Sequence, residues 1–372
     1  MTLKIDIYSS FNSELETLWR NIEDNCEYFV FQSYEWLQHW QHTIGDTSYD
    51  IKPVVVVVSD STRLLALFPL GIRKIGVVRV LEFLGGAQTD YNAPLILPEF
   101  FTCSQLIALW DAVLEMLPVH DVRYFVRTPH KVSNLPNPIL GQATPYCDGV
   151  SYAATLPNSW ELFRQRLPKR FQKDNARMIR RLSEKGDYQF KIANTAAEFN
   201  TIVEVMLKQK ARRYKETGAR NILADMNTCT FYRELETAIG NDVNIHMSAL
   251  ILNGEILATH LGAYDKNRFY YLFPTFKDGM WSKFSPGRLL LENLVKWAIT
   301  KQIRTFDFTI GGESYKDVWC DSEMSLYRFV KPITFRGNVY ARIQALINWV
   351  KTNRRARALA MRVVRMLNTL KY

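Results

Sequence analysis

A short stretch in the last third of the chain contains the polar side chains whose types and spacing could do chemistry. Asp307 lies between two phenylalanines, and the Gly311-Gly312 turn that follows leads to Glu313, Tyr315 and Lys316. A carboxylate, a phenol and an ammonium in one cleft could move protons and stabilise a developing negative charge. A strand with Asp307 on its solvent side and a plain surface loop after it are the alternatives.

A second candidate site lies just upstream, where Ser285-Pro286-Gly287-Arg288 leads into an apolar helical run. Serine is favoured at a helix N-cap and proline at the first helical position. We expect the backbone N–H groups from Gly287 to Leu289 to lack partners inside the helix. Such groups bind phosphate at the positive end of the helix dipole, and Arg288 could add a charge. An ordinary capped helix start is the alternative.

His260 competes with Asp307 and Glu313 for the role of general base, because the ordinary pKa of histidine lies near neutral pH. A strand histidine with satisfied hydrogen bonds is the alternative. The five cysteines are scattered without a Cys-x-x-Cys pair, and His39 and His42 have no further ligand near them. We therefore expect neither a metal site nor a disulfide framework.

Basic residues recur on the helical pattern of residues 159–185, where Arg177 and Arg181 lie near one face. With Arg213 and Tyr214 they could clamp a phosphorylated acceptor, such as a nucleotide-linked or lipid-linked amino sugar. A solvated charged face is the alternative.

Two positions outside these motifs could line the same cleft. Lys210 lies one turn before Tyr214 and could join the clamp. Asp90 follows the Gly85-Gly86 turn in the first part of the chain, and there a plain turn is the favoured interpretation.

Two series of helices and strands must position these side chains. The Asn253-Gly254 pair predicts a hairpin, and Leu64-Leu65-Ala66 is echoed by Ile256-Leu257-Ala258, which suggests a duplication. Residues 129–149, rich in Pro and Gly, are expected to form a loop or domain crossing. Helices are expected at 12–44, with a break near Cys26, and at 102–117, 159–185, 196–218, 228–239 and 286–301. Strands are expected at 54–59, 64–72, 77–84, 122–128, 188–193, 245–252, 256–264, 269–273 and 305–309. The pattern favours an α+β fold with two domains, at 1–149 and 150–335.

The charge is unevenly distributed along the 372 residues. Eleven of the 47 Lys and Arg, and none of the 37 Asp and Glu, lie after residue 323. The preceding residues are thus close to neutral, and we expect no nucleic-acid partner. Residues 336–372 read as a basic amphipathic helical tail, with a helical pattern over 340–372, that could lie on an anionic membrane surface. A helix packed on the body is the alternative.

No stretch is long and apolar enough to span a bilayer, and the first residues lack the apolar run of a signal peptide. We expect a cytoplasmic protein, peripheral on the inner face of the cell membrane if the tail binds lipid.

Several motifs resemble the CelD/BcsL-like branch of the GNAT superfamily, named for cellulose biosynthesis and similar to the Fem transferases. The resemblance covers roughly residues 30–330 and rests on Ser285-Pro286-Gly287-Arg288-Leu289-Leu290-Leu291, Phe306-Asp307-Phe308, Gly311-Gly312, Tyr315-Lys316, Trp319, the 167–182 helix and His260-Leu261-Gly262 ahead of Tyr270-Tyr271. It implies tandem GNAT-like domains, the first degenerate and the second binding acyl-CoA between splayed strands. It also implies that the helix starting at Ser285 faces the pyrophosphate of coenzyme A.

From the resemblance and the residues together we expect an acyl-CoA-dependent N-acyltransferase. The acceptor is an amine of a sugar nucleotide, glycolipid or polysaccharide precursor of the cell envelope or exopolysaccharide. The acyl-CoA, acetyl-CoA or a longer thioester, is a co-substrate, and no metal is needed. Fem-like transfer from an aminoacyl-tRNA and a non-catalytic scaffold in a polysaccharide assembly complex are the alternatives.

Overall fold

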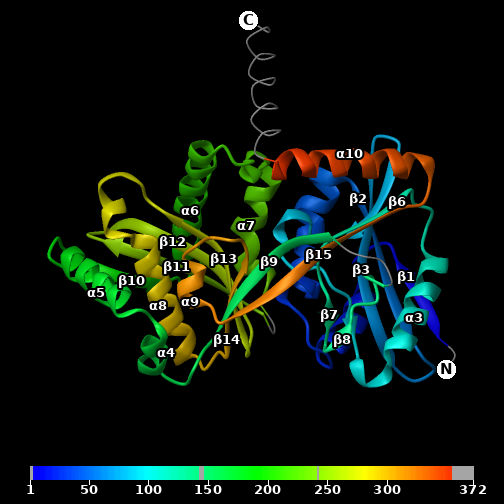
Figure 1. Cartoon of the computed structure of the whole chain (residues 1–372), viewed down its shortest axis with the longest axis horizontal. Helices are drawn as coiled ribbons and strands as arrows, with labels where there is room; N and C mark the ends of the chain where they lie inside the picture. Colours follow the sequence, from blue (N-terminus) through cyan, green and yellow to red (C-terminus); the bar gives the residue numbers. More distant parts are fainter. Residues whose placement is uncertain (1–2, 142–145, 241–242, 354–372) are drawn as a thin grey trace, which may run out of the picture.

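The computed structural model describes residues 3–141, 146–240 and 243–353. One mixed sheet runs through the described chain in the order β1-β2-β3-β4-β6-β15-β9-β14-β13-β12-β11-β10 (Figure 1). Helices cover both of its faces, so the expected α+β architecture of a mixed sheet flanked by helices is confirmed.

The first half of the sheet is antiparallel except where β4 runs parallel to β6. Its strands are β1 (Lys4–Tyr8), β2 (Ile51–Ser59), β3 (Leu64–Ile75), β4 (Val78–Phe83), β5 (Leu95–Ile96), which pairs with β3, and β6 (Val122–Pro129), while β7 (Lys131–Val132) and β8 (Leu135–Pro136) form a separate ladder. Its helices are α1 (Ser13–Glu23), α2 (Tyr34–Trp40), which continues as a π-helical segment at Gln41–Tyr49, and α3 (Cys103–Met116).

The second half repeats this pattern, with β13 parallel to β14 after an antiparallel meander. Its strands are β10 (Tyr188–Ile192), β11 (Asn244–Leu252), β12 (Glu255–Tyr264), β13 (Arg268–Phe276) and β14 (Thr305–Ile310). Its helices are α4 (Trp160–Arg166), α5 (Lys169–Ser183), α6 (Ala196–Thr217), α7 (Met226–Ala238), α8 (Pro286–Thr300) and the single turn α9 (Lys316–Trp319). The expected hairpin at Asn253-Gly254 is present, and both of its residues have positive φ.

Two long strands join the halves. β9 (Tyr146–Thr155) pairs with β14 and with β15 (Ser322–Pro332), and β15 pairs in turn with β6. From the sequence, residues 129–149 were expected to form a loop or domain crossing, and no strand was expected at β15. That loop expectation is wrong for β7, β8 and the start of β9. Polar residues interrupt both long strands, which are partly exposed, so neither shows the alternation that marks a half-buried strand.

The single helix expected at 159–185 is two helices. α4 ends before Leu167, and Pro168 adopts an extended conformation before α5 begins. Proline disfavours the helical conformation in the residue before it, so the chain turns there and aims α5 in a new direction.

The two faces of the second half carry different helices. Helices α6 and α7 pack on one face, in a cluster with Met247, Ala249 and Leu261 of the sheet. Helices α4, α5 and α8 pack on the other face, against Leu250 and Leu257. Side chains on α5 and α6 are therefore separated by the sheet.

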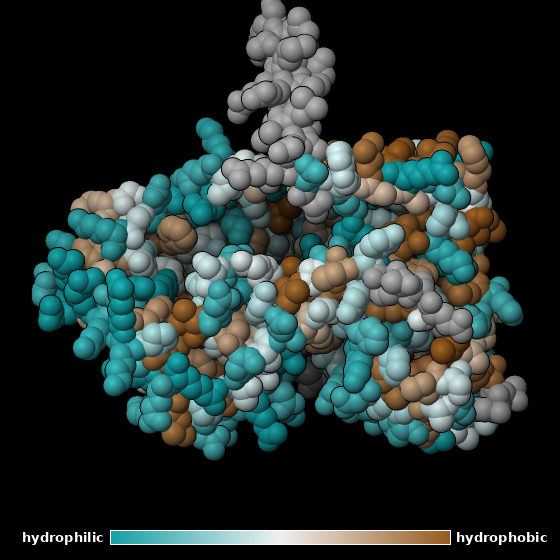
Figure 2. Space-filling view, viewed as in Figure 1, coloured by the Kyte–Doolittle hydropathy of each residue, from teal (hydrophilic) through white to brown (hydrophobic). Residues whose placement is uncertain are grey.

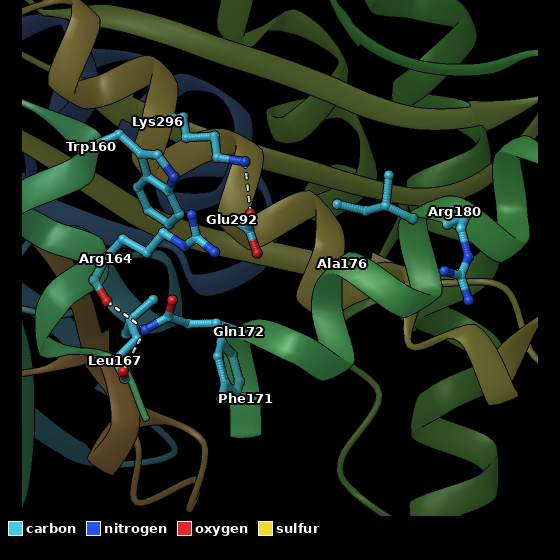
Figure 3. Close-up of a pocket in the computed structure, with 10 residues that line it drawn as sticks. Trp160, Arg164, Leu167, Phe171, Gln172, Ala176, Arg180, Glu292 and Lys296 are labelled. Carbon is cyan, nitrogen blue, oxygen red and sulfur yellow. Dashed lines mark hydrogen bonds and ion pairs between the residues drawn. The ribbon is translucent and has the colours of Figure 1, made fainter. Parts of the chain in front are cut away.

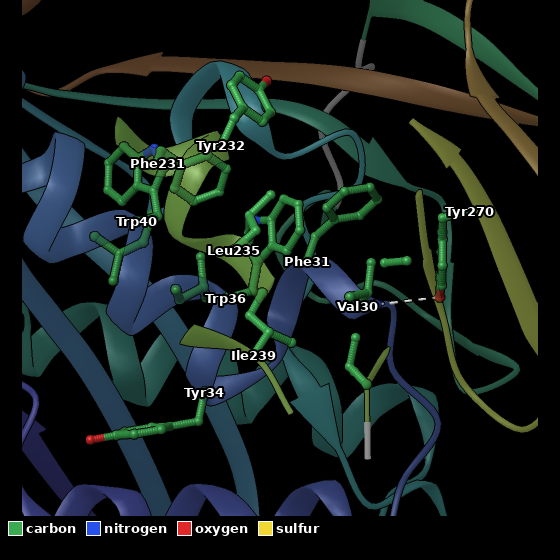
Figure 4. Close-up of a cluster of buried hydrophobic side chains, with 14 of the residues drawn as sticks. Val30, Phe31, Tyr34, Trp36, Trp40, Phe231, Tyr232, Leu235, Ile239 and Tyr270 are labelled. Carbon is green, nitrogen blue, oxygen red and sulfur yellow. Dashed lines mark hydrogen bonds between the residues drawn. The ribbon is translucent and has the colours of Figure 1, made fainter. Parts of the chain in front are cut away.

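The first of these clusters also joins the two halves (Figure 4). Phe31, from the segment before α2, packs edge-on against Tyr270 of β13 with ring centroids 5.6 Å apart. Trp36 packs in the same way against Phe231 of α7, at 5.4 Å. The backbone N–H of Val30 donates to the hydroxyl of Tyr270 at 3.3 Å. This shared core fixes the first half against the second.

The last described helix, α10 (Phe335–Thr352), lies along one edge of the molecule and contacts β4, β6 and β15 (Figure 1). The expected tail helix over 340–372 is present as far as Thr352, and residues 354–372 lie outside the described residues.

Candidate active site

The two parallel strands of the second half separate and leave a cleft. Their last paired residues are Tyr270 of β13 and Asp307 of β14. Beyond this point β13 stays with β12, whereas β14 stays with β9. The resulting cleft has a volume of about 280 Å³. It is lined by Trp36, Ala87, Gln88, Asp90, Lys210, Tyr214, Ile222, Tyr232, Tyr271, Leu272, Phe273, Pro274, Phe308, Thr309, Ile310, Glu313, Tyr315 and Lys316.

Asp307 lies where β14 separates from β13, and its hydrogen bonds stabilise the chain there. Its buried carboxylate accepts hydrogen bonds from the hydroxyl of Tyr91 and from Nη1 of Arg268, both at 2.6 Å. It also accepts the backbone N–H of Thr309 at 2.8 Å. Thr309 has a φ of +54°, a conformation that costs energy for a β-branched residue. Asp307 is thus buried and paired, and it stabilises the bulge that turns β14 away from β13.

The bulge brings together the three polar residues that the sequence places after Asp307. The carbonyl oxygen of Thr309 accepts a hydrogen bond from Nζ of Lys316 at 3.2 Å, and Lys316 forms an ion pair with Glu313 at 3.1 Å. Tyr315 lies beside them in the cleft lining, and burial raises the pKa of its hydroxyl. The structure therefore places Glu313, Tyr315 and Lys316 at one cleft.

The first half of the chain contributes Asp90 to the same cleft. Its carboxylate lies 3.4 Å from Nη1 of Arg127, which also donates to the carbonyl oxygen of Thr89 at 2.6 Å. Burial raises the pKa of Asp90, and Arg127 opposes that shift. From the sequence alone, a plain turn was the favoured interpretation of Asp90. Trp36, Gln88 and Tyr232 also line the cleft and were not proposed, because no local pattern links residues so far apart in the chain.

Lys210 on α6 is a half-buried cation of the cleft. Its Nζ lies 4.2 Å from the ring centroid of Phe273, and among the described residues it forms no ion pair. Burial lowers the pKa of Lys210 to about 8. Tyr214, one turn further along, lines the cleft as well. Arg213 is exposed, outside the cleft lining, and pairs with Glu216 at 3.8 Å.

His260 is not in the cleft lining and lies behind Tyr271, in an aromatic cluster on the α8 face. It is fully buried and stacks on Tyr271 with ring centroids 4.5 Å apart. Neither ring nitrogen has a hydrogen-bond partner among the described residues. Burial lowers its pKa well below the ordinary value. A neutral, enclosed imidazole cannot reach a substrate in the cleft, so the general-base hypothesis for His260 is not supported.

The start of α8 differs in detail from the sequence expectation. Ser285 separates α8 from the 3-10 turn before it by a left-handed conformation (φ +52°), and its side chain makes no capping hydrogen bond. The amides of Arg288 and Leu289 donate to the carbonyl oxygen of Ser285 at 3.0 and 3.2 Å. The expectation of three bare amides is therefore wrong for these two, because the first helical turn already uses them. The amide of Gly287 has no such bond among the described residues.

The surroundings of α8 connect its start with β13. A Cβ added to Gly287 would lie 3.4 Å from Phe276, two residues beyond the cleft-lining Pro274. The guanidinium of Arg288 instead lies over the ring of Phe171 at 5.0 Å, on the α5 side. Leu289 is a buried core residue. The backbone amide of Gly287 is thus accessible to an anion near the end of β13, the strand that borders the cleft.

The arginines of α5 do not lie at this cleft. Arg177 and Arg181 are exposed, and Arg177 pairs with Asp174 of its own helix at 3.1 Å. Helix α5 borders a different hollow of about 360 Å³ between α4, α5 and α8, with Phe171 and Arg180 in its wall (Figure 3). Because α5 and α6 cover opposite faces of the sheet, the expected clamp of α5 arginines with Arg213 and Tyr214 is not assembled.

Other site types have no support among the described residues. No group of His, Cys, Asp and Glu there could hold a metal ion, and all five cysteines are free thiols. None of the described helices combines the length and hydropathy that a membrane span requires.

Residues 169–317 match a family model described as an acetyltransferase (GNAT) domain. No curated protein matches the chain. The crystal structure of FemX superposes with a TM-score of 0.59 at 10% identity, over 88% of this chain and 97% of that one. L-PGS from Bacillus licheniformis superposes with a TM-score of 0.50 at 12% identity, over 92% of this chain and 98% of that one. These findings support a GNAT-type acyltransferase fold for the chain, as the sequence resemblance implied.

Proposed function

We propose that the chain transfers an acyl group from a coenzyme A thioester to an amine in the cleft between β13 and β14. The observation that carries this proposal is the separation of two parallel strands after Tyr270 and Asp307, next to a helix that starts without a side-chain cap. Separated strands offer unpaired backbone groups to an extended amide chain. The Gly287 amide and the α8 dipole suit a pyrophosphate at the strand end.

The cleft residues fit the proton transfers that this reaction requires. The amine nitrogen attacks the thioester carbonyl carbon, the C–S bond breaks, one amine proton leaves and the departing thiolate gains a proton. We assign Glu313 as the base that removes the amine proton, directly or through water. Tyr315 or Lys210 supplies the proton to the thiolate, whose ordinary pKa of about 8.5 lies near that of Lys210. Lys316 stabilises the oxyanion.

The proposal also covers the amine acceptor, the location of the protein and the alternative acyl donor. Asp90 and Glu313 place two carboxylates in the cleft lining, which suits an ammonium or amine. We propose the amine of a sugar nucleotide, glycolipid or polysaccharide precursor, handled by a cytoplasmic protein of the CelD/BcsL-like branch. A Fem-like aminoacyl-tRNA donor is the second candidate, and the near-neutral charge of residues 1–323 disfavours it.

The test combines ligand binding with turnover. Coenzyme A thioesters of increasing chain length should stabilise the protein in a thermal unfolding assay, by about 2.7 kcal/mol at a hundred times the Kd. Transfer RNA should have no such effect. Glu313→Gln and Tyr315→Phe should then slow acylation of amino sugars, followed by mass spectrometry. Absence of stabilisation by every thioester would overturn the proposal, and stabilisation with wild-type turnover in both variants would overturn the residue assignment.

A further inference from the structure

Helix α10 has an apolar face that the other described residues leave uncovered. The helix packs on β4, β6 and β15 with Gly337 and Tyr340 buried beneath it. Large apolar side chains on its other side remain exposed, and we call this set the outer stripe. It consists of Phe335 (84% exposed), Val339 (43%), Ile343 (50%), Leu346 (60%) and Ile347 (39%).

The spacing of the outer stripe makes it one continuous face. Its members follow one another at intervals of four, four, three and one residues, which places them within about one third of the helix circumference. The buried Gly337 falls on the opposite side, and the buried Tyr340 falls next to Ile347, where the stripe meets the packed side of the helix. Figure 2 shows hydrophobic residues gathered at the edge of the molecule occupied by α10. Contiguous exposed apolar patches of this kind mark interaction surfaces.

The charges around the outer stripe indicate the chemistry of its partner. Arg336 and Arg342 are exposed on α10. The helix periodicity places Arg342 at the border of the stripe beside Phe335, and Arg336 within the arc of the stripe, in the first turn of the helix. No Asp or Glu occurs in residues 324–372, whereas eleven Lys and Arg do. A second copy of the chain would bring these like charges together. An apolar partner with an anionic surface complements both the stripe and the arginines.

We propose that α10 lies in the plane of an anionic lipid bilayer, with the outer stripe in the interface and its arginines at the headgroups. A helix with one apolar face and basic side chains beside it can lie in the plane of the bilayer interface. It is held there by the burial of its apolar area and by attraction to anionic lipid. The surface lies on the first half of the sheet and includes none of the cleft residues. This inference is therefore independent of the acyl transfer reaction.

The test is co-sedimentation of the full chain with vesicles. Wild-type protein should bind vesicles of phosphatidylglycerol and phosphatidylcholine, and should bind pure phosphatidylcholine at least about tenfold more weakly. The triple variant Phe335→Ser, Ile343→Ser, Leu346→Ser should lose about tenfold or more of the binding to the anionic vesicles. The control is Val77→Ser with Val119→Ser, which removes two other exposed apolar side chains and should bind as wild type does.

Three other results of the vesicle experiment would contradict the proposal that α10 binds the bilayer. Wild-type protein that ignores anionic vesicles, or a triple variant that binds them as tightly as wild type, would exclude α10 as the membrane surface. A wild-type dimer that the triple variant converts to a monomer, without vesicle binding, would make the stripe an interface between copies. Leu346→Ser alone repeats the measurement with a smaller change, and an unchanged unfolding temperature verifies that the fold is intact.

Discussion

The two halves of the sheet contain the same parallel strand pair, β4 with β6 and β13 with β14, and they differ in what lies beyond the last paired residues. In the first half Phe83 and Phe125 meet with ring centroids 5.3 Å apart, and Trp110 of α3 packs against Phe125. These rings are buried in the core of the first half, and Trp110 also borders a separate hollow of about 390 Å³. In the second half Tyr271 and Phe308 border the cleft. The same backbone arrangement is therefore filled in one half and open in the other.

The helices that lie between the two strands of each pair, α3 and α8, also differ at their first residues. Thr102 caps α3 reciprocally with Gln105, through its side-chain oxygen and through its own amide at 2.8 Å. Ser285 makes no such bond at the start of α8. Among the described residues neither the amide of Ser104 in α3 nor that of Gly287 in α8 has a hydrogen-bond partner. The two helix starts therefore differ in the side-chain cap and in the missing side chain at Gly287. The comparison supports our proposal that residues 1–149 form a degenerate domain and residues 150–335 the acyl-CoA-binding one.

The first half nevertheless has a place in the site. Arg127 of β6 has a φ of +52° and Thr309 of β14 one of +54°, and each backbone N–H donates to a carboxylate, that of Asp148 or Asp307. The bulge in β14 directs Lys316 to the cleft, and the bulge in β6 directs Arg127 to Asp90. The first half thus forms one wall of the cleft in the second.

The largest effect should come from Lys210→Met. If Lys210 supplies a proton or a positive charge in the cleft, kcat should fall by about a hundredfold. Lys208→Met, an exposed lysine on the same helix, is the matched control and should leave kcat unchanged. Equal turnover in the two variants would remove Lys210 from the mechanism.

The pH dependence sharpens this test, because burial places the folded-state pKa of Lys210 at about 8, below the ordinary 10.5. Lys210 is protonated below pH 8, so kcat should decline as the pH rises through 8 if the ammonium is required. Folding stability should change with pH in the opposite direction to kcat. The half-buried ammonium of Lys210 lowers stability below pH 8, and this loss disappears as the pH approaches 10.5. Lys210→Met should therefore raise the denaturant midpoint at pH 7 while it lowers kcat.

Asp307→Asn should cause the largest loss of stability, about 3 kcal/mol, because it leaves Arg268 without its carboxylate. Chemical denaturation measures this loss. The double variant Arg268→Met, Asp307→Asn should recover part of it, since the unpaired cation is then absent. If Asp307→Asn unfolds at the wild-type midpoint, Asp307 does not hold the strands where they divide.

The sequence was informative where the signal is local. The apolar periodicity, the Asn253-Gly254 turn and the run from Glu313 to Lys316 predicted elements and cleft residues within a few positions. It was not informative where the site depends on distant contacts. Nothing near Trp36 or Asp90 indicates that they lie against β14, and a histidine in a strand, such as His260, looks the same whether it is buried or catalytic. Burial and long-range pairing decide these cases.

Gly287→Val should separate ligand binding from folding at the α8 start. The added side chain meets Phe276 only at an ordinary contact distance, so the fold should persist. It occupies the approach to the Gly287 amide, and the KM for the acyl-CoA should rise about tenfold with little change in kcat. Ser104→Val, at the corresponding position of α3, should change neither constant. An unaltered KM in Gly287→Val would remove the pyrophosphate from this helix start.

The smallest expected effect tests the difference between the two helix starts directly. Thr102→Ala removes a side-chain cap and should cost about 1 kcal/mol of unfolding free energy. Ser285→Ala removes no hydrogen bond and should cost almost nothing, while Ser285→Gly should stabilise by about 0.5 kcal/mol because glycine tolerates the left-handed conformation. Denaturant titrations of the three variants resolve these values. Equal losses in Thr102→Ala and Ser285→Ala would show that Ser285 caps α8 after all, and the open helix start would then no longer distinguish the second half from the first.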